Sequence, residues 1–239
     1  VLMITTSVEI IAIYGLAALL PVIFLLQYVY RLDSIEKEPS SLLWKLIGGG
    51  VFAAIAAMIL EFVFVKDIDS STASLEEILL NAVLVGIFEE VMKFFFLKKF
   101  SWKNEAFNYR FDGVVYAIFV SLGFAAFENI LYVFLYGGLS VALSRALLSI
   151  PAHMSFGAYM GIYYGRAKVC EKAGDEVGTT ANLFTGVLFA ILFHTIYDAT
   201  LMIRSNLSIL VFVLVVIFIY FYVFARIRRE ARMDASVEK

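Results

Sequence analysis

The chain has 239 residues, of which 62% are hydrophobic and 17% are charged, and its formal net charge is −2. Its mean hydropathy of +0.89 excludes the usual balance of a soluble globular protein. We expect a multi-pass protein of the cell membrane, in contact with the lipid bilayer and without a nucleic-acid partner.

An α-helix needs about 20 apolar residues to cross a bilayer, and the sequence divides into about seven such blocks separated by short polar breaks. The expected spans cover residues 8–30, 42–65, 77–98, 112–136, 141–166, 182–203 and 206–227. The first block has no basic residues before it and is long, so we expect a retained helix rather than a cleaved signal peptide. The predicted fold class is all-α, a polytopic transmembrane helix bundle.

The polar breaks predict a single membrane-embedded domain over residues 1–239, in which residues 206–239 form the last span and a basic tail. The longest break, "RAKVCEKAGDEVGTT", is predicted to be a loop of ordinary length. Cys170 lies in it and is the only cysteine, which excludes an intrachain disulfide.

Lysine and arginine residues favour alternate breaks. One set of breaks carries Arg31, Lys37, Lys45, Lys98, Lys99, Lys103, Arg110, Arg166, Lys168, Lys172 and the tail "RIRREARMDASVEK". The other set carries only Lys66, Arg145 and Arg204. Because basic residues near helix ends stay cytoplasmic, we expect the N-terminus outside and the C-terminus in the cytoplasm.

Ionisable residues inside spans are costly in hydrocarbon and normally face the interior of the bundle. The polar residues of interest are Glu89, Glu90 and Lys93 in the third span, Glu128 and Asn129 in the fourth, His153 in the fifth, and His194 and Asp198 in the sixth. Residues three or four apart share a helix face, so Lys93 can neutralise one of the two glutamates. The depth of these residues predicts a shared cavity that is reached from outside.

Two kinds of chemistry suit such a cavity. His153, His194 and Glu90 are suitable ligands for a catalytic zinc that activates water. Alternatively, a glutamate acts as general base on water without a metal, while a histidine and Asn129 stabilise the oxyanion. Either route hydrolyses an amide. The predicted catalytic residues are Glu89, Glu90, His153, Glu128, His194 and Asp198, with Lys93 and Asn129 in supporting roles.

Four stretches of the sequence match known motifs in order. They are "EEVMK", "FDGVVYAIFVSLGFAAFENILY", "PAHMSFGAYMG" and "HTIYD". They are similar to the EExxK, DGxxY…GFAxxEN, HxxFGxxxG and HxxxD motifs of the PrsW family of membrane-embedded peptidases, which the sequence resembles. The resemblance covers about residues 28–205 in order and spacing, including "DSIEKEP" after the first span. Ala117 and Ser121 stand where the family often has glycine.

The resemblance implies a fold distantly shared with CAAX-processing proteases and with the Aph-1 subunit of gamma-secretase. It also implies site-1 cleavage of a single-span membrane protein such as an anti-sigma factor. Among the site residues it implies the most direct catalytic role for His153.

Two other function classes stay open at this stage. A non-catalytic scaffold of the Aph-1 type would use the polar cluster only to lock helices together. An ion-coupled transporter would also need buried carboxylates and histidines, although no duplicated half with paired broken helices is visible in the sequence.

Overall fold

A computed structural model describes residues 2–69, 71–136, 139–203 and 205–238. Its elements are α1 (Leu2–Leu32), α2 (Ser40–Phe64), α3 (Leu75–Ser101), α4 (Asp112–Tyr136), α5 (Leu139–Leu147), α6 (Ser149–Lys172), α7 (Glu176–Ile203), α8 (Asn206–Ile217), the π-helix η1 (Phe218–Val223) and α9 (Phe224–Arg232). Within these described ranges, the β-type pairing is one isolated bridge between Tyr109 and Ser236. The all-α prediction is confirmed.

Helix lengths agree with a multi-pass membrane protein. Five helices are long and apolar enough to cross a bilayer, at Ile13–Leu32, Ser40–Phe64, Asp112–Tyr136, Glu176–Ile203 and Asn206–Arg232. α3 and α6, with 27 and 24 residues, are also long enough to cross. Buried polar residues such as Glu90 in α3 and His153 in α6 lower the hydropathy of these two helices.

The expected span over 141–166 is wrong in its boundaries, because the chain breaks at Leu148 between α5 and α6. Pro151 lies in the first turn of α6, where it lacks an N–H and its ring conflicts with a helical carbonyl at Leu147. The freed Leu147 carbonyl instead accepts a hydrogen bond of 2.5 Å from the Tyr220 hydroxyl. α6 therefore starts eight residues later than expected and runs to Lys172.

The break "RAKVCEKAGDEVGTT" is not the predicted loop, because α6 and α7 extend into it and leave only residues 173–175 between them. Cys170 consequently lies in α6. The polar side chains of this stretch bond along the helices, as Lys168 does with Glu171 at 2.6 Å. Gly174, with a φ of +74°, adopts the left-handed conformation that ends α6.

Helix α4 is the centre of the bundle and packs against α1, α2, α3, α5 and α6. Small residues set its distance from α6: a Cβ on Gly161 would lie 2.6 Å from the Gly113 carbonyl oxygen. A similar close approach joins α3 to α7, because a Cβ on Gly86 would lie 2.9 Å from Thr195 Oγ1. These contacts bring the four helices that carry the predicted site residues together.

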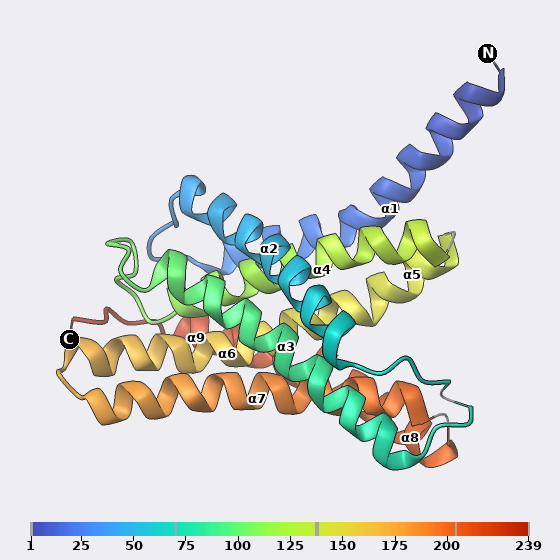
Figure 1. The fold of residues 1–239 in the computed structure, drawn as a ribbon. Coiled ribbons are helices and arrows are strands. Elements are labelled where there is room, and N and C mark those ends of the chain that lie inside the picture. Colours follow the sequence, from blue (N-terminus) through green and yellow to red (C-terminus); the bar gives the residue numbers. More distant parts are fainter. Residues whose placement is uncertain (1, 70, 137–138, 204, 239) are drawn as a thin grey trace.

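The connections gather at two opposite ends of the bundle (Figure 1). One end, which we call the tail end, holds residues 33–39, 102–111, 173–175 and 233–238, together with the helix turns that adjoin them. Contacts tie it together: Asn108 Nδ2 donates to Glu36 Oε2 at 3.0 Å, and Lys172 pairs with Glu238 at 3.4 Å. The other end holds residues 65–69 and 71–74, together with α5. Which end faces the cytoplasm stays a prediction, and Arg204 lies outside the described residues.

Candidate active site

Three charged side chains of α3 lie together in the interior. Ser74 and Glu77 form a capping box that begins α3. Further along the same helix, Lys93 Nζ donates to Glu90 Oε1 at 2.7 Å and to Glu89 Oε2 at 3.1 Å. Lys93 therefore contacts both glutamates, although its single positive charge balances only one of them. The i,i+3 and i,i+4 spacings place both carboxylates within reach of one ammonium group.

His194 of α7 lies against the same carboxylates. Its Nδ1 is 2.8 Å from Glu90 Oε1, and its Nε2 is 3.3 Å from Asp198 Oδ2 and 3.8 Å from Glu89 Oε2. Both ring nitrogens thus face carboxylate oxygens. This arrangement suits an imidazolium, or a neutral ring with one nitrogen turned to a metal ion.

His153 of α6 completes the group from the other side. Its Nδ1 is 3.1 Å from Lys93 Nζ and its Nε2 is 2.9 Å from Glu128 Oε2. An ammonium group can only donate, so Nδ1 accepts and the proton of a neutral ring lies on Nε2, where it is donated to Glu128. The ring also lies edge to face with His194, at a centroid distance of 5.3 Å.

Arg145 of α5 reaches the same wall. Its Nη2 donates to Glu128 Oε2 at 2.8 Å and its Nε donates to Asn129 Oδ1 at 3.0 Å. The Asn129 amide donates to the Ala18 carbonyl of α1 at 2.7 Å. Asn129 thus connects α1, α4 and α5, and its amide N–H is directed away from the predicted role at the oxyanion.

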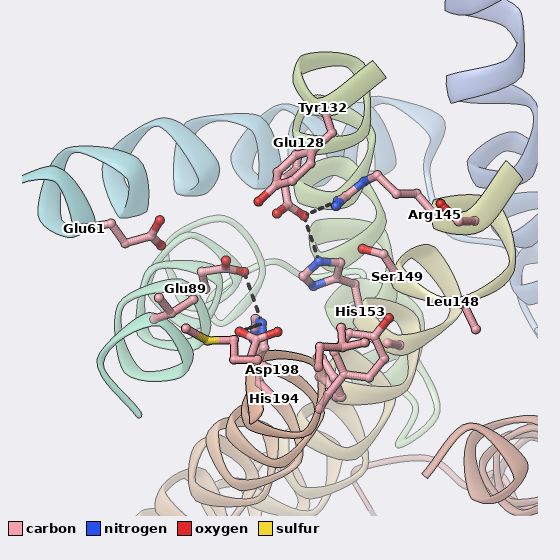
Figure 2. Close-up of a pocket in the computed structure, with 17 residues that line it drawn as sticks. Glu61, Glu89, Glu128, Tyr132, Arg145, Leu148, Ser149, His153, His194 and Asp198 are labelled. Carbon is pink, nitrogen blue, oxygen red and sulfur yellow. Dashed lines mark hydrogen bonds and ion pairs between the residues drawn. The ribbon is translucent and has the colours of Figure 1, made fainter. Parts of the chain in front are cut away.

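A cavity of about 490 Å³ runs between these residues, and we call it the chamber. Figure 2 shows the carboxylates and imidazoles that point into it from α2, α3, α4, α6 and α7. Its polar lining comprises Glu61, Glu89, Glu128, Tyr132, Ser144, Arg145, Ser149, His153, His194, Tyr197 and Asp198. Glu90 and Lys93 do not line the cavity themselves, but Glu90 contacts His194 and Lys93 contacts Glu89 and His153. We call the end of the bundle that holds α5 the chamber end.

The structure brings all six predicted catalytic residues together, through the contacts of Lys93, His153 and His194. It also adds Glu61, Tyr132 and Arg145 to the chamber. Glu61 was missed because it lies near the end of the second span, in "ILEFVFVKDID", where a charge suggests a helix terminus. The sequence signal that could have identified Glu61 is the apolar run before it in α2, which makes it an ionisable residue inside a span.

Glu89, Glu90, His153 and His194 could hold a metal ion, because one ligand atom from each lies within 4.8 Å of the others. Imidazole and carboxylate groups are suitable donors for zinc. Glu90 Oε2 is buried and has no hydrogen-bond partner among the described residues, so it is free to coordinate. By contrast, a metal ion on Glu90 Oε1 or His153 Nδ1 would replace a contact with Lys93. The donor set fits a divalent metal.

Comparisons with known proteins identify the family of this chain. The sequence profile of the family described as "PrsW family intramembrane metalloprotease" matches residues 38–225. "Protease PrsW" of Halalkalibacterium halodurans is 32% identical over 197 residues, which cover 82% of this chain and 87% of that protein. "Protease PrsW" of Geobacillus kaustophilus is 34% identical over 191 residues, 80% of each chain.

"Protease PrsW" of Bacillus subtilis is 32% identical over 190 residues, which cover 80% of this chain and 83% of that protein. The search of solved structures found no significant match. The match of the family profile to most of the chain, and the similarity of relatives over four fifths of it, confirm the resemblance of the motifs. The chain belongs to the PrsW family of intramembrane metalloproteases.

Proposed function

We propose that this protein is an endopeptidase that hydrolyses a peptide bond of a single-span membrane protein near the outer membrane face. The observation that carries the proposal is the chamber, in which Glu89 lines a cavity of about 490 Å³ beside two histidines. Such a cavity offers a water-activating base together with groups that can hold a metal or an oxyanion.

Glu89 is the residue we assign as general base, because it lines the chamber whereas Glu90 lies behind it. Glu89 takes a proton from water as the water oxygen bonds to the peptide carbonyl carbon. The same proton passes to the leaving amine when the carbon–nitrogen bond breaks. Glu90 positions His194 through its contact of 2.8 Å, and Lys93 donates to both carboxylates and holds one of them ionised.

His153, His194 and Glu90 would hold a zinc ion. When bound, zinc polarises the peptide carbonyl and makes water a better nucleophile. In the metal-free alternative, Glu89 acts as general base on water without zinc. An N–H of His153 or His194 then stabilises the oxyanion. Elemental analysis of protein purified without chelators separates the two. Zinc at about one per chain supports the metal route, whereas fully active protein with less than about one-tenth per chain contradicts it.

The orientation and substrate belong to the same proposal. The basic residues of the tail end, which include Lys37, Lys98, Lys103 and Lys172, favour a cytoplasmic position for it. The chamber end then faces outward with the N-terminus. A single-span substrate would be cut close to that face, and the resemblance to the family favours an anti-sigma factor in a site-1 cleavage.

The test is cleavage of a candidate anti-sigma factor in proteoliposomes by the native protein and by Glu89→Gln, Glu90→Gln and His153→Ala. We expect Glu89→Gln to lower kcat by about 10²–10⁴-fold, and the other two variants to be strongly impaired. Full activity in all three would overturn the site assignment. Cleavage on the tail-end side of the span would overturn the orientation.

A further inference from the structure

Glu61 is a chamber residue that belongs to none of the sequence motifs. It lies on α2, the helix across the chamber from α6, and is half-buried. Its carboxylate points into the same space as those of Glu89 and Glu128 (Figure 2). It is therefore available to a molecule that enters the chamber.

The other carboxylates of the site all have partners. Glu89 and Glu90 share Lys93. Glu128 pairs with Arg145 and Asp198 lies against His194. Glu61 differs, because within the described ranges it has neither a hydrogen bond nor an ion pair from its side chain, and its Oε1 is a buried oxygen without a partner.

The number of charged groups at the chamber also indicates that Glu61 is available to bind a cation. The chamber and the groups behind it hold five carboxylates but only two permanent cations, Lys93 and Arg145. Neither of these cations contacts Glu61, which is the one carboxylate of the five without a partner among the described residues. An unpaired charge in a membrane interior is costly. A cation supplied by the bound substrate would remove that cost at Glu61, the carboxylate that lacks a partner.

We infer that Glu61 is a specificity residue that binds a lysine or arginine side chain of the substrate segment entering the chamber. The inference rests on the proposed function, since it concerns the substrate of the same site. Acidic segments would be disfavoured by the carboxylates that surround the cavity. Glu61 binds rather than reacts, so its loss should raise KM for basic substrates and leave kcat nearly unchanged.

The experiment uses single-span peptides of one fixed sequence in nanodiscs, with lysine, glutamine or glutamate placed in turn at each position of the segment outside the span. Cleavage by the native protein gives kcat and KM, and binding is measured separately with the Glu89→Gln variant. At one position we expect KM and Kd about tenfold lower for the lysine peptide than for the glutamate peptide.

Glu61→Gln should remove that preference, and Glu61→Lys should reverse it. Glu76→Gln is the matched control, because Glu76 is an exposed carboxylate in the first turn of α3 at the same end of the bundle. It should keep the preference for lysine. Glu61→Gln should keep the melting temperature of the native protein, which shows that the variant is folded.

Three outcomes are decisive. If Glu61→Gln lowers kcat equally for all peptides, Glu61 acts in the reaction, for example as a proton donor, and the inference is wrong. If cleavage occurs without a charge preference, the inference is wrong while the proposed function stands. If no peptide is cleaved but the lysine peptide binds through Glu61, the proposed function fails while the inference stands.

Discussion

The two ends of the bundle use buried carboxylates in different ways. At the tail end, Asp112 Oδ2 accepts backbone N–H groups from Tyr109 at 2.7 Å and Asn108 at 3.0 Å. Glu38 accepts the hydroxyl of Tyr116. In the chamber, by contrast, the carboxylates other than Glu61 contact cations and imidazoles beside a cavity.

The difference separates structural from chemical use of the same group. Backbone amides at the tail end fix the connections between helices, and a carboxylate satisfied by them has little freedom to bind anything else. Chamber carboxylates instead hold groups that can exchange a proton or coordinate a metal. We therefore expect substitutions at the tail end to change stability, and substitutions at the chamber surface to change activity.

Lys93 should be an exception to this division, because it belongs to the chamber and yet its substitution should lower stability. It serves the chamber but is only 1% exposed, and it contacts two carboxylates that are also buried. Lys93→Met would leave both without their cation, so we expect the free energy of unfolding to fall by about 3–5 kcal/mol. Thermal and denaturant unfolding in detergent measure the loss.

The double variant Lys93→Met, Glu90→Gln provides the control for Lys93. It removes one of the stranded charges and should recover part of the lost stability. A single variant as stable as the native protein would show that the two glutamates need no cation, and the charge assignment around Lys93 would be wrong.

Asp198 tests whether a substitution in the chamber changes activity rather than stability. It lies 3.3 Å from His194 Nε2 and fixes the orientation of that ring. Asp198→Asn should keep the shape but weaken this hold, and lower kcat/KM or the affinity for zinc by about 10–100-fold. The melting temperature should stay close to native. If activity is unchanged while stability falls, Asp198 is a structural residue like those of the tail end.

Asp33 tests whether tail-end carboxyls contribute to stability, through the pH dependence of unfolding. It is 1% exposed, and burial raises the pKa of its carboxyl to about 6, against the lowering effect of Lys37. Burial also raises the pKa of Glu38, to about 7. The folded state therefore binds more protons than the unfolded state between about pH 4 and 7, and its stability falls as pH rises through that window.

We expect Asp33→Asn, which stays neutral, to flatten this dependence by about 2 kcal/mol between pH 4 and 7. Melting curves at a series of pH values measure it, and part of the slope should remain because Glu38 is unchanged. Peptide cleavage should not change. A pH dependence of stability identical to that of the native protein would contradict the role given to Asp33.

Most of the helices could be predicted because an apolar block of about 20 residues has one stable arrangement in a bilayer. The errors lie at positions where hydropathy alone predicted the wrong helix boundary. Pro151 sits inside an apolar run, so its effect on the Leu147 carbonyl was hidden by hydropathy. The charged stretch around Lys168 was assigned to a loop, although its charges pair along a helix.

The site residues could be selected because any ionisable group inside a span requires a reason. Their partners could not be, since pairing depends on how helices far apart in the sequence approach one another. The contacts of Lys93 with His153 and of Arg145 with Glu128 cross between helices. Glu61 was overlooked for a simpler reason, which is its position close to the end of α2.

The most direct test compares Glu89→Gln with Asp112→Ala in one preparation, by measuring cleavage of a single-span substrate and thermal unfolding side by side. We predict that Glu89→Gln loses about 10³-fold in kcat and keeps its melting temperature, because Lys93 retains Glu90 as a partner. Asp112→Ala should lose about 2 kcal/mol of stability and cleave at the native rate below its melting temperature. Native cleavage by Glu89→Gln, or inactive but folded Asp112→Ala, would contradict the division between the two ends.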